Sequence, residues 1–126
     1  MPAINFRRQC VPMIESGEKI MEICPPGAYM IEPGDSIQLF TGMYTHAWTL
    51  IMNTVCVENS KFYIFTDHMI TINGHLLKQK ETSVLASSAG YSSEKALIDY
   101  IAVAHGIPFQ GELIRWKPRE VSNGTA

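Results

Sequence analysis

Cationic side chains near both ends of this 126-residue chain form a pattern that suits contact with phosphate groups. Arg115 and Lys117 are two residues apart, so on an extended strand they share one face, while Trp116 between them is expected to point into the core. Arg7 and Arg8 come from the opposite end of the chain. If the two ends meet at one edge of the fold, the four cations form a local patch that could hold a nucleic-acid backbone. The alternative is ordinary solvated charge on the protein surface.

A second group of polar residues follows a predicted strand at 36–40. Thr41, Gly42 and Thr45 lie at the end of this strand, where backbone N–H groups in a turn could receive a phosphate. Tyr44 in the same stretch could stack on a base. We therefore keep Thr41 and Tyr44 as candidate ligand-binding residues, although most loops of this composition bind no ligand.

Lys19 and Glu22 place opposite charges three residues apart. A lysine can donate to a phosphate or a base carbonyl, and a glutamate can act as a base or accept a hydrogen bond from an amine. On a regular strand, residues i and i+3 point to opposite faces, so the pair could act together only if the chain bends or bulges there. The alternative is that both are exposed charges on the rim of the fold.

The cysteine and histidine residues show no pattern of a metal site. Three cysteines cannot all pair, no two of them have the two-residue spacing of a zinc knuckle, and the four histidines are scattered. We therefore expect reduced thiols, no bound metal and no cofactor. These residues are Cys10, Cys24 and Cys56, and His46, His68, His75 and His105.

Length and composition predict one packed domain. Apolar residues make up 46% of the chain and charged residues 17%, which is the balance of a globular core. The formal charge of −2 excludes a chain-wide positive field, so any contact with nucleic acid must be local. The longest apolar stretch, at 48–57, is too short to span a bilayer, and the first residues do not form a secretory signal. We expect a soluble, cytoplasmic protein with no membrane partner.

Short strands and few helices must position the candidate residues. Strands are predicted at 4–6, 19–24, 36–40, 48–58, 61–65, 70–72, 75–77 and 112–117. Asn59 with Ser60, and Asn73 with Gly74, should each turn a hairpin. Gly17 should end one or two helical turns at 8–16.

One clear helix is predicted after an N-cap at Ser92. Its buried stripe should be Leu97, Tyr100, Ile101 and Ala104. Together these elements predict an α+β fold, a small, mostly antiparallel β-barrel with one or two flanking helices. The domain should span residues 1–117, with a flexible tail at 118–126.

Four segments resemble the ASCH domain, a family of small PUA-like β-barrels. FRRQCVPMIESGEKIMEICPP at 6–26 and PGDSIQLFTGMYT at 33–45 carry most of the resemblance. LASSAGYSS at 85–93 is similar to the segment that leads into the family's main helix, and IPFQGELIRW at 107–116 to its closing strand. The resemblance covers about residues 4–117. It looks most like the short, stand-alone members of bacteria and tailed phages.

The resemblance implies a cleft beside the barrel that binds RNA, a modified nucleoside or a nucleotide. Its most specific parts are Gly17 with Lys19 and Gly34 with Asp35. Lys19 falls on the lysine of the family's G-x-K motif, which is assigned to catalysis in relatives that resemble acetylcytidine amidohydrolases. We therefore expect Lys19→Ala to weaken binding several-fold without changing the melting temperature.

Other positions depart from the family pattern. Glu22 stands where those amidohydrolases carry a threonine nucleophile, and Cys24 where an arginine is usual. The family's acidic residue falls at about Ala89, and two of its basic positions appear here as Tyr44 and His46. These departures leave open whether catalysis survives.

Three functions are consistent with these patterns. The first is binding of RNA or of a nucleoside or nucleotide around Lys19 and Glu22, with Arg115 and Lys117 steering the backbone. The second is a small amidohydrolase or ribonuclease that uses Glu22 in place of the replaced groups. The third is a protein-interaction module, in which a decayed cleft contacts a host protein.

Overall fold

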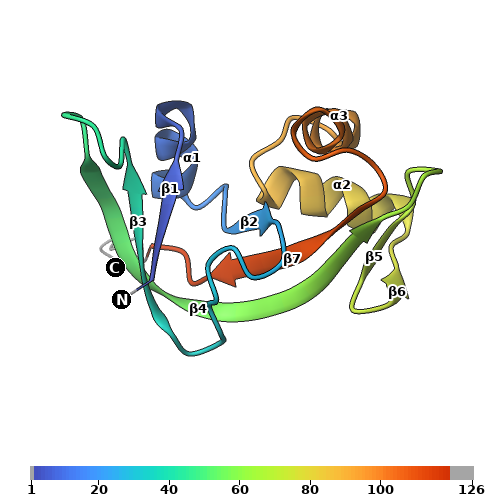
Figure 1. The fold of residues 1–126 in the computed structure, drawn as a ribbon, viewed down its shortest axis with the longest axis horizontal. Coiled ribbons are helices and arrows are strands. Elements are labelled where there is room, and N and C mark those ends of the chain that lie inside the picture. The colour runs from blue at the N-terminus through green and yellow to red at the C-terminus, as the bar shows by residue number, and fades with distance from the viewer. Residues whose placement is uncertain (1, 120–126) are drawn as a thin grey trace, which may run out of the picture.

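The computed structural model of the protein describes residues 2–119, in which one mixed sheet of seven strands carries three α-helices and a short 3-10 helix (Figure 1). The strands are β1 (Ala3–Phe6), β2 (Met21–Cys24), β3 (Ser36–Thr41), β4 (Thr49–Ile64), β5 (Ile70–Ile72), β6 (His75–Leu76) and β7 (Phe109–Trp116). The helices are η1 (Arg8–Cys10), α1 (Val11–Ser16), α2 (Gln79–Ser88) and α3 (Glu94–Ala104). The predicted α+β class is confirmed, with more helices than the one or two expected.

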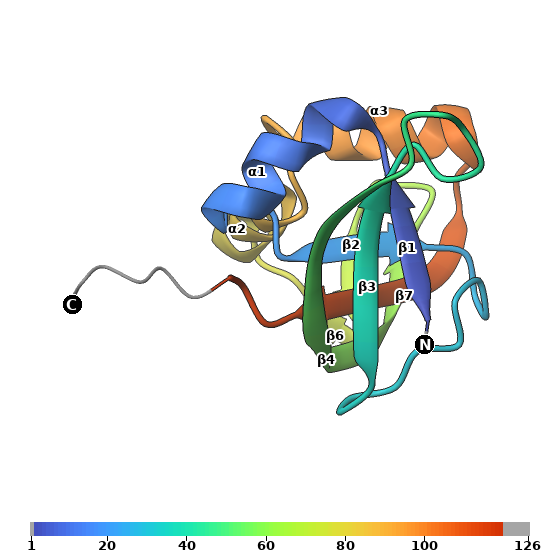
Figure 2. The same cartoon turned by 90° about the vertical axis from the view of Figure 1, so that its left-hand side faces the viewer.

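Strand β4 connects the two halves of the sheet. Its first part pairs antiparallel with β3, and its second part pairs antiparallel with β7 and β5. β1 adds to β3 in parallel, and β2 adds to β7 antiparallel. Figure 1 shows β4 curving along the base of the molecule, and Figure 2 shows β1 and β3 running side by side while β2 and β7 cross behind them. The sheet is therefore strongly bent.

The predicted closure of the sheet into a β-barrel is wrong. Within residues 2–119, β1 pairs with β3 alone and β2 pairs with β7 alone, so each leaves one edge open. A carbonyl of β2 is occupied by a side chain, because Lys19 Nζ donates to Met21 O at 3.0 Å. This contact takes an acceptor that a closing strand would need. The sheet stays open between β1 and β2.

The predicted hairpin at Asn59 and Ser60 is also wrong, because β4 continues through both residues. Asn59 Nδ2 donates to Ile31 O at 2.6 Å, and the Ser60 hydroxyl donates to the Glu58 carboxylate. Their side chains thus form hydrogen bonds within the folded protein and do not form a turn. The register shifts between Cys56 and Glu58, so a bulge bends β4 shortly before the position of the expected turn.

Two local predictions are confirmed. Asn73 and Gly74 have φ angles of 51° and 84° and join β5 to β6, as expected for a two-residue hairpin turn. Gly17 ends α1 with a left-handed φ of 86°. Both features depend on a few neighbouring residues.

The helices differ in detail from the predictions. Helix α2 was not predicted, because most of its side chains are polar. In the structure only three of its residues are buried, Thr82, Leu85 and Ala86. Helix α3 is capped by Ser93, whose hydroxyl accepts from Ala96 N at 3.1 Å, where Ser92 was predicted. Its buried residues are Leu97, Ile98 and Ile101, whereas the predicted core residues Tyr100 and Ala104 are exposed.

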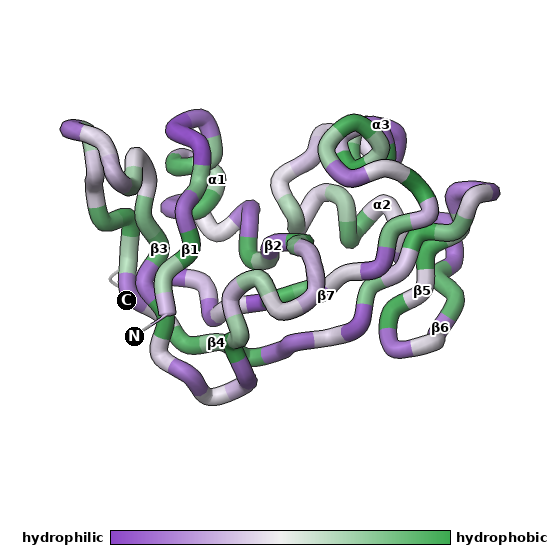
Figure 3. The backbone as a smooth tube through the Cα atoms, viewed as in Figure 1, coloured by the Kyte–Doolittle hydropathy of each residue, from purple (hydrophilic) through white to green (hydrophobic). Residues whose placement is uncertain are grey.

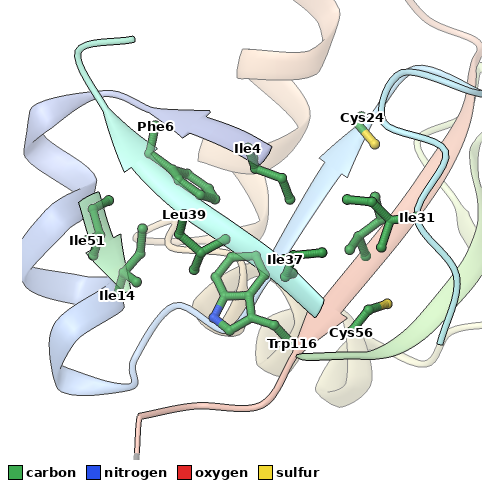
Figure 4. Packing of buried hydrophobic residues seen from close by; sticks show 11 residues of the cluster. Ile4, Phe6, Ile14, Cys24, Ile31, Ile37, Leu39, Ile51, Cys56 and Trp116 are labelled. Atoms are coloured by element: carbon green, nitrogen blue, oxygen red, sulfur yellow. The ribbon is translucent and has the colours of Figure 1, made fainter. Parts of the chain in front are cut away.

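The core consists of two clusters that meet along β7. The first cluster surrounds Trp116, which is fully buried as predicted and packs edge-on against Phe6 with ring centroids 5.5 Å apart. Figure 4 shows the side chains of β1 and β3 converging on this indole. The second cluster joins Leu113 of β7 to the buried sides of α2 and α3. The first cluster therefore supports β1 and α1, and the second supports α2 and α3.

No helix among residues 2–119 is long and apolar enough to cross a membrane. Figure 3 shows hydrophobic and hydrophilic residues alternating over short distances along β4. Of the predicted tail at 118–126, residues 120–126 lie outside the described part of the chain. Arg119 lies against β4 and donates to Ile51 O at 2.9 Å.

Candidate ligand-binding site

A cavity of about 340 Å³ lies between the open edges of β1 and β2. One wall comes from β1 and η1, the opposite wall from β2, and the turn between α2 and α3 closes a third side. Figure 1 shows α1 and α3 on the same side of the sheet, with β2 between them. The charged, aromatic and thiol side chains of the lining include Phe6, Arg7, Cys10, Lys19, Glu22, Cys24, Tyr29, Tyr91 and Tyr100.

Lys19 lies in the bend between α1 and β2. After the left-handed turn at Gly17, the Lys19 N–H donates to Met13 O at 3.0 Å, and the Ile20 N–H donates to Ser88 O at 2.9 Å. The bend is thereby fixed to the ends of two helices. The regular strand begins only at Met21, so the rule that places residues 19 and 22 on opposite faces does not apply.

The Lys19 side chain is buried, with 4% of its surface exposed, so the alternative of a solvated rim charge is wrong for this residue. Its Nζ donates to Met21 O at 3.0 Å, to Glu22 Oε1 at 3.1 Å and to Ala89 O at 2.5 Å. It also lies 5.6 Å from the ring centroid of Phe6. A lysine ammonium has three N–H donors, so the protein itself uses all of them.

Glu22 is the partly accessible member of the pair, with 25% of its side chain exposed. Lys19 holds Oε1, and among residues 2–119 no donor hydrogen-bonds to the other carboxylate oxygen. The ion pair fixes the carboxylate in place and leaves one oxygen for a ligand. This division of roles differs from the sequence-based expectation, in which Lys19 itself contacts the ligand.

Three tyrosines, Tyr29, Tyr91 and Tyr100, line the same cavity as this carboxylate. Burial, with a smaller contribution from the negative charge of Glu22, raises the pKa of Tyr29 to about 12. The same two causes, in the same order, raise the pKa of Tyr91, whose ring lies 5.8 Å from that of Tyr100. At neutral pH, Tyr29 and Tyr91 are therefore hydroxyl groups that can donate a hydrogen bond. None of the three was recognised as a site residue from the sequence, in which Tyr91 appeared only within the segment LASSAGYSS at 85–93 that resembles the ASCH family.

Arg7 is the predicted cation that the fold brings to Lys19 and Glu22. It lines the cavity, and its guanidinium lies 5.2 Å from the ring centroid of Tyr100, so the contact links the residue that precedes η1 to α3. Arg8 follows on η1 and is exposed to solvent.

The other predicted ligand-binding residues lie outside the cavity lining. The Thr41 hydroxyl donates to Phe6 O at 2.8 Å and ties β3 to β1, and Tyr44 is exposed on the following loop. Arg115 donates to Glu58 Oε1 at 2.9 Å. Lys117 borders a separate hollow on β4. The structure therefore gathers three of the eight predicted residues, Arg7, Lys19 and Glu22, in one place.

Cys10 and Cys24 line the cavity, but Cys24 is buried and Cys10 is partly exposed. Burial raises the pKa of the Cys24 thiol to about 12, with smaller contributions from Glu112 and Glu22. Burial also raises the pKa of Cys56, which lies in the core. Cys10 is partly exposed. Since thiolates are the reactive form, the two buried thiols should be unreactive in the folded protein.

We therefore expect one thiol, Cys10, to react quickly with an aromatic disulfide reagent at pH 8 in the native protein. The remaining two should react only after denaturation, and Cys10→Ser should abolish the fast phase. Release of two or three equivalents in the fast phase would contradict the burial of Cys24 and Cys56.

The arrangement combines a fixed carboxylate, phenol hydroxyls and a guanidinium around an aromatic hollow. Within residues 2–119, no group of three or more His, Cys, Asp or Glu side chains is placed to hold a metal ion. Comparisons of the chain with protein-family models, with curated proteins and with solved structures found no match. The chemistry of the cavity is therefore the guide to function.

Proposed function

We propose that this protein binds a nucleobase in the cavity between β1 and β2, as part of RNA or as a free, including modified, nucleoside or nucleotide. The observation that carries the proposal is the Glu22 carboxylate, held by buried Lys19 inside a hollow lined by aromatic rings. Sites for small ligands have volumes of about 300–1,000 Å³. At about 340 Å³ the cavity suits one base with its sugar, and it is too small for a second nucleoside.

Each group has a distinct role in this proposal. Glu22 accepts a hydrogen bond from an exocyclic amine of the base through the oxygen that Lys19 leaves unoccupied. Lys19 is a positioning residue, because its donors are used by the protein. Tyr29 and Tyr91 donate to ring nitrogens or carbonyl oxygens of the base, and Arg7 binds a phosphate at the mouth of the cavity.

The resemblance to the ASCH family supports the same site, and we propose that the protein is an open variant of that PUA-like fold. The family pattern expects a carboxylate near residue 89 and a threonine at residue 22. Here Ala89 offers its backbone carbonyl to Lys19, and Glu22 offers a carboxylate to the same ammonium. A carboxylate beside the lysine is thus retained, although it comes from another element.

The hydrolase alternative has less support. The threonine nucleophile of the amidohydrolases is replaced by Glu22. A lysine that donates three hydrogen bonds has no lone pair with which to take a proton or attack a carbon. We therefore favour a binding protein, and expect no turnover of acetylated cytidine or of short RNA.

The direct test is Glu22→Gln, which removes the charge but keeps the shape. We expect the affinity for the 5′-monophosphates of adenosine, cytidine or guanosine to fall about tenfold in calorimetric titration, because a charge-assisted hydrogen bond becomes a neutral one. Uridine monophosphate lacks an exocyclic amine and should bind the unaltered protein more weakly than the other three.

The matched control is Glu15→Gln, on the exposed side of α1, which should leave all affinities unchanged. Equal affinities in the Glu22 variant and the unaltered protein would exclude Glu22 from the site. Failure of all four monophosphates to bind would overturn the proposed function.

A further inference from the structure

We propose that the base in the cavity belongs to a single-stranded nucleic acid, and that an aromatic loop beside the cavity stacks the neighbouring base. The aromatic loop comprises residues 42–48, between β3 and β4, and carries Tyr44 and Trp48. This inference rests on the proposed function and extends it, since it selects a strand over a free nucleoside.

The aromatic loop presents two large rings to solvent. Tyr44 is 84% exposed and Trp48 46% exposed, and their ring centroids are 5.0 Å apart. The edge of the group is formed by Phe40, whose ring centroid lies 5.9 Å from that of Trp48. Clustered exposed aromatic residues are uncommon on a surface that has no partner.

The loop is held in a defined shape. The Thr45 hydroxyl donates to Gly42 O at 2.6 Å and accepts from Ala47 N at 3.0 Å. Gly42 is required for this shape, because an added Cβ would lie 2.5 Å from Ala47 O. Tyr44 has a left-handed φ of 64°, which is unfavourable for a bulky side chain. Such strain is retained where the surrounding structure fixes it, and it often marks a binding surface.

The aromatic loop begins beside the cavity. β1 and β3 are parallel, with Phe6 opposite Thr41, so the carboxyl ends of both strands lie next to each other at one end of the sheet (Figures 1 and 2). Arg7 and Arg8 follow β1 at that end, and the aromatic loop follows β3 there. Asn5 joins the two features, because it lines the cavity and its Oδ1 accepts from the backbone N–H of Met43 at 3.0 Å.

This order of groups matches the chemistry of a single strand. Proteins that bind single strands combine cations, which contact the backbone phosphates, with aromatic rings on which bases stack. Here Arg7 lines the cavity, and Arg7 and Arg8 directly follow β1 at the end of the sheet where the aromatic loop follows β3. A strand with one base at Glu22 would have its phosphate at the arginines and its next base at Trp48. The positive charge favours a nucleic acid over an apolar protein partner.

The two tryptophans make the test direct, since Trp48 is 46% exposed and Trp116 is fully buried. We compare adenosine monophosphate with the adenine trinucleotide, in ribose and deoxyribose forms, by titration and by tryptophan fluorescence. The trinucleotide should bind at least tenfold more tightly than the monophosphate and quench the emission of Trp48. Binding of either sugar form supports the proposal.

Trp48→Ala should lower the trinucleotide affinity about tenfold and leave the monophosphate affinity unchanged, and Tyr44→Ala should act in the same direction. The matched control is Phe65→Ala, which removes another exposed ring, 42% exposed, away from the cavity lining and should change neither affinity.

The outcomes separate this inference from the proposed function. If the monophosphate binds through Glu22 but the trinucleotide binds no tighter, the aromatic loop has no role and the proposed function remains. If the trinucleotide depends on Trp48 but not on Glu22, its base is not in the cavity and this inference is overturned, whereas the proposed function is decided by the monophosphate titration of Glu22→Gln. Concentration-dependent self-association that Trp48→Ala abolishes, without quenching by the trinucleotide, would assign the loop to protein contact and overturn this inference.

Discussion

Lys19→Met is expected to lower the free energy of unfolding by about 3 kcal/mol, equivalent to a fall of about 10 °C in melting temperature. Methionine keeps an unbranched stem but has no N–H donors. The substitution therefore leaves the carbonyls of Met21 and Ala89 without their buried partner and removes the counter-ion of Glu22. Buried polar groups that lose their only partner are among the larger sources of destabilisation.

This result would correct the sequence-based expectation that loss of Lys19 alters binding alone. The measurements are thermal and denaturant unfolding of the full chain, with nucleotide titration at a temperature where the variant is folded. Lys80→Met, on the exposed side of α2, is the control and should change the free energy of unfolding by less than about 0.5 kcal/mol. An unchanged melting temperature for Lys19→Met would show that the ammonium is solvated.

Gly90→Ala is expected to destabilise the protein by about 2–3 kcal/mol and to weaken nucleotide binding. Gly90 has a φ of +91°, and the added Cβ would lie 2.9 Å from Cδ of Lys19 and 3.5 Å from Cε of Met13. A left-handed conformation alone costs an alanine about 1–2 kcal/mol. The remainder comes from displacement of the Lys19 stem, which three hydrogen bonds hold in place, and this displacement would release Glu22 from its fixed position.

Gly106→Ala separates the two contributions. Gly106 has a similar φ of +86°, but nothing lies within 4 Å of the position that an added methyl group would take, so only the backbone contribution should appear. Unfolding curves and nucleotide titrations of the two variants give the difference due to Lys19. Equal losses of stability, with unchanged affinity in both variants, would mean that Gly90 does not constrain the lysine.

Some features of this protein could be predicted from short stretches of sequence. Asn73 with Gly74 indicated a hairpin because the turn needs two positive φ angles, and both angles are present. Gly17 indicated the end of α1 for the same local reason. The alternation along the last strand placed Trp116 in the core. Each of these features depends on residues that are neighbours in the chain.

Other predictions were wrong because distant segments decided the outcome. Asn59 and Ser60 are typical turn residues, yet contacts with Ile31 and Glu58 keep them within β4. Tyr100 fitted the apolar stripe of α3, yet it lies against Arg7 at the cavity. Sequence spacing indicates only that a residue can occupy a given face, and the packing of other elements determines which face is covered.

The sequence by itself determined the α+β class, the local turns and the presence of a lysine and a glutamate close enough in the chain to form a pair. Only the tertiary structure decided that the sheet stays open between β1 and β2, that Lys19 is buried, and that three tyrosines line the same cavity as Glu22. The physical reason is that the contacts that fix the site are long-range. The bond from Lys19 to Ala89 O joins residues 70 positions apart, and no periodicity within a short segment contains that information.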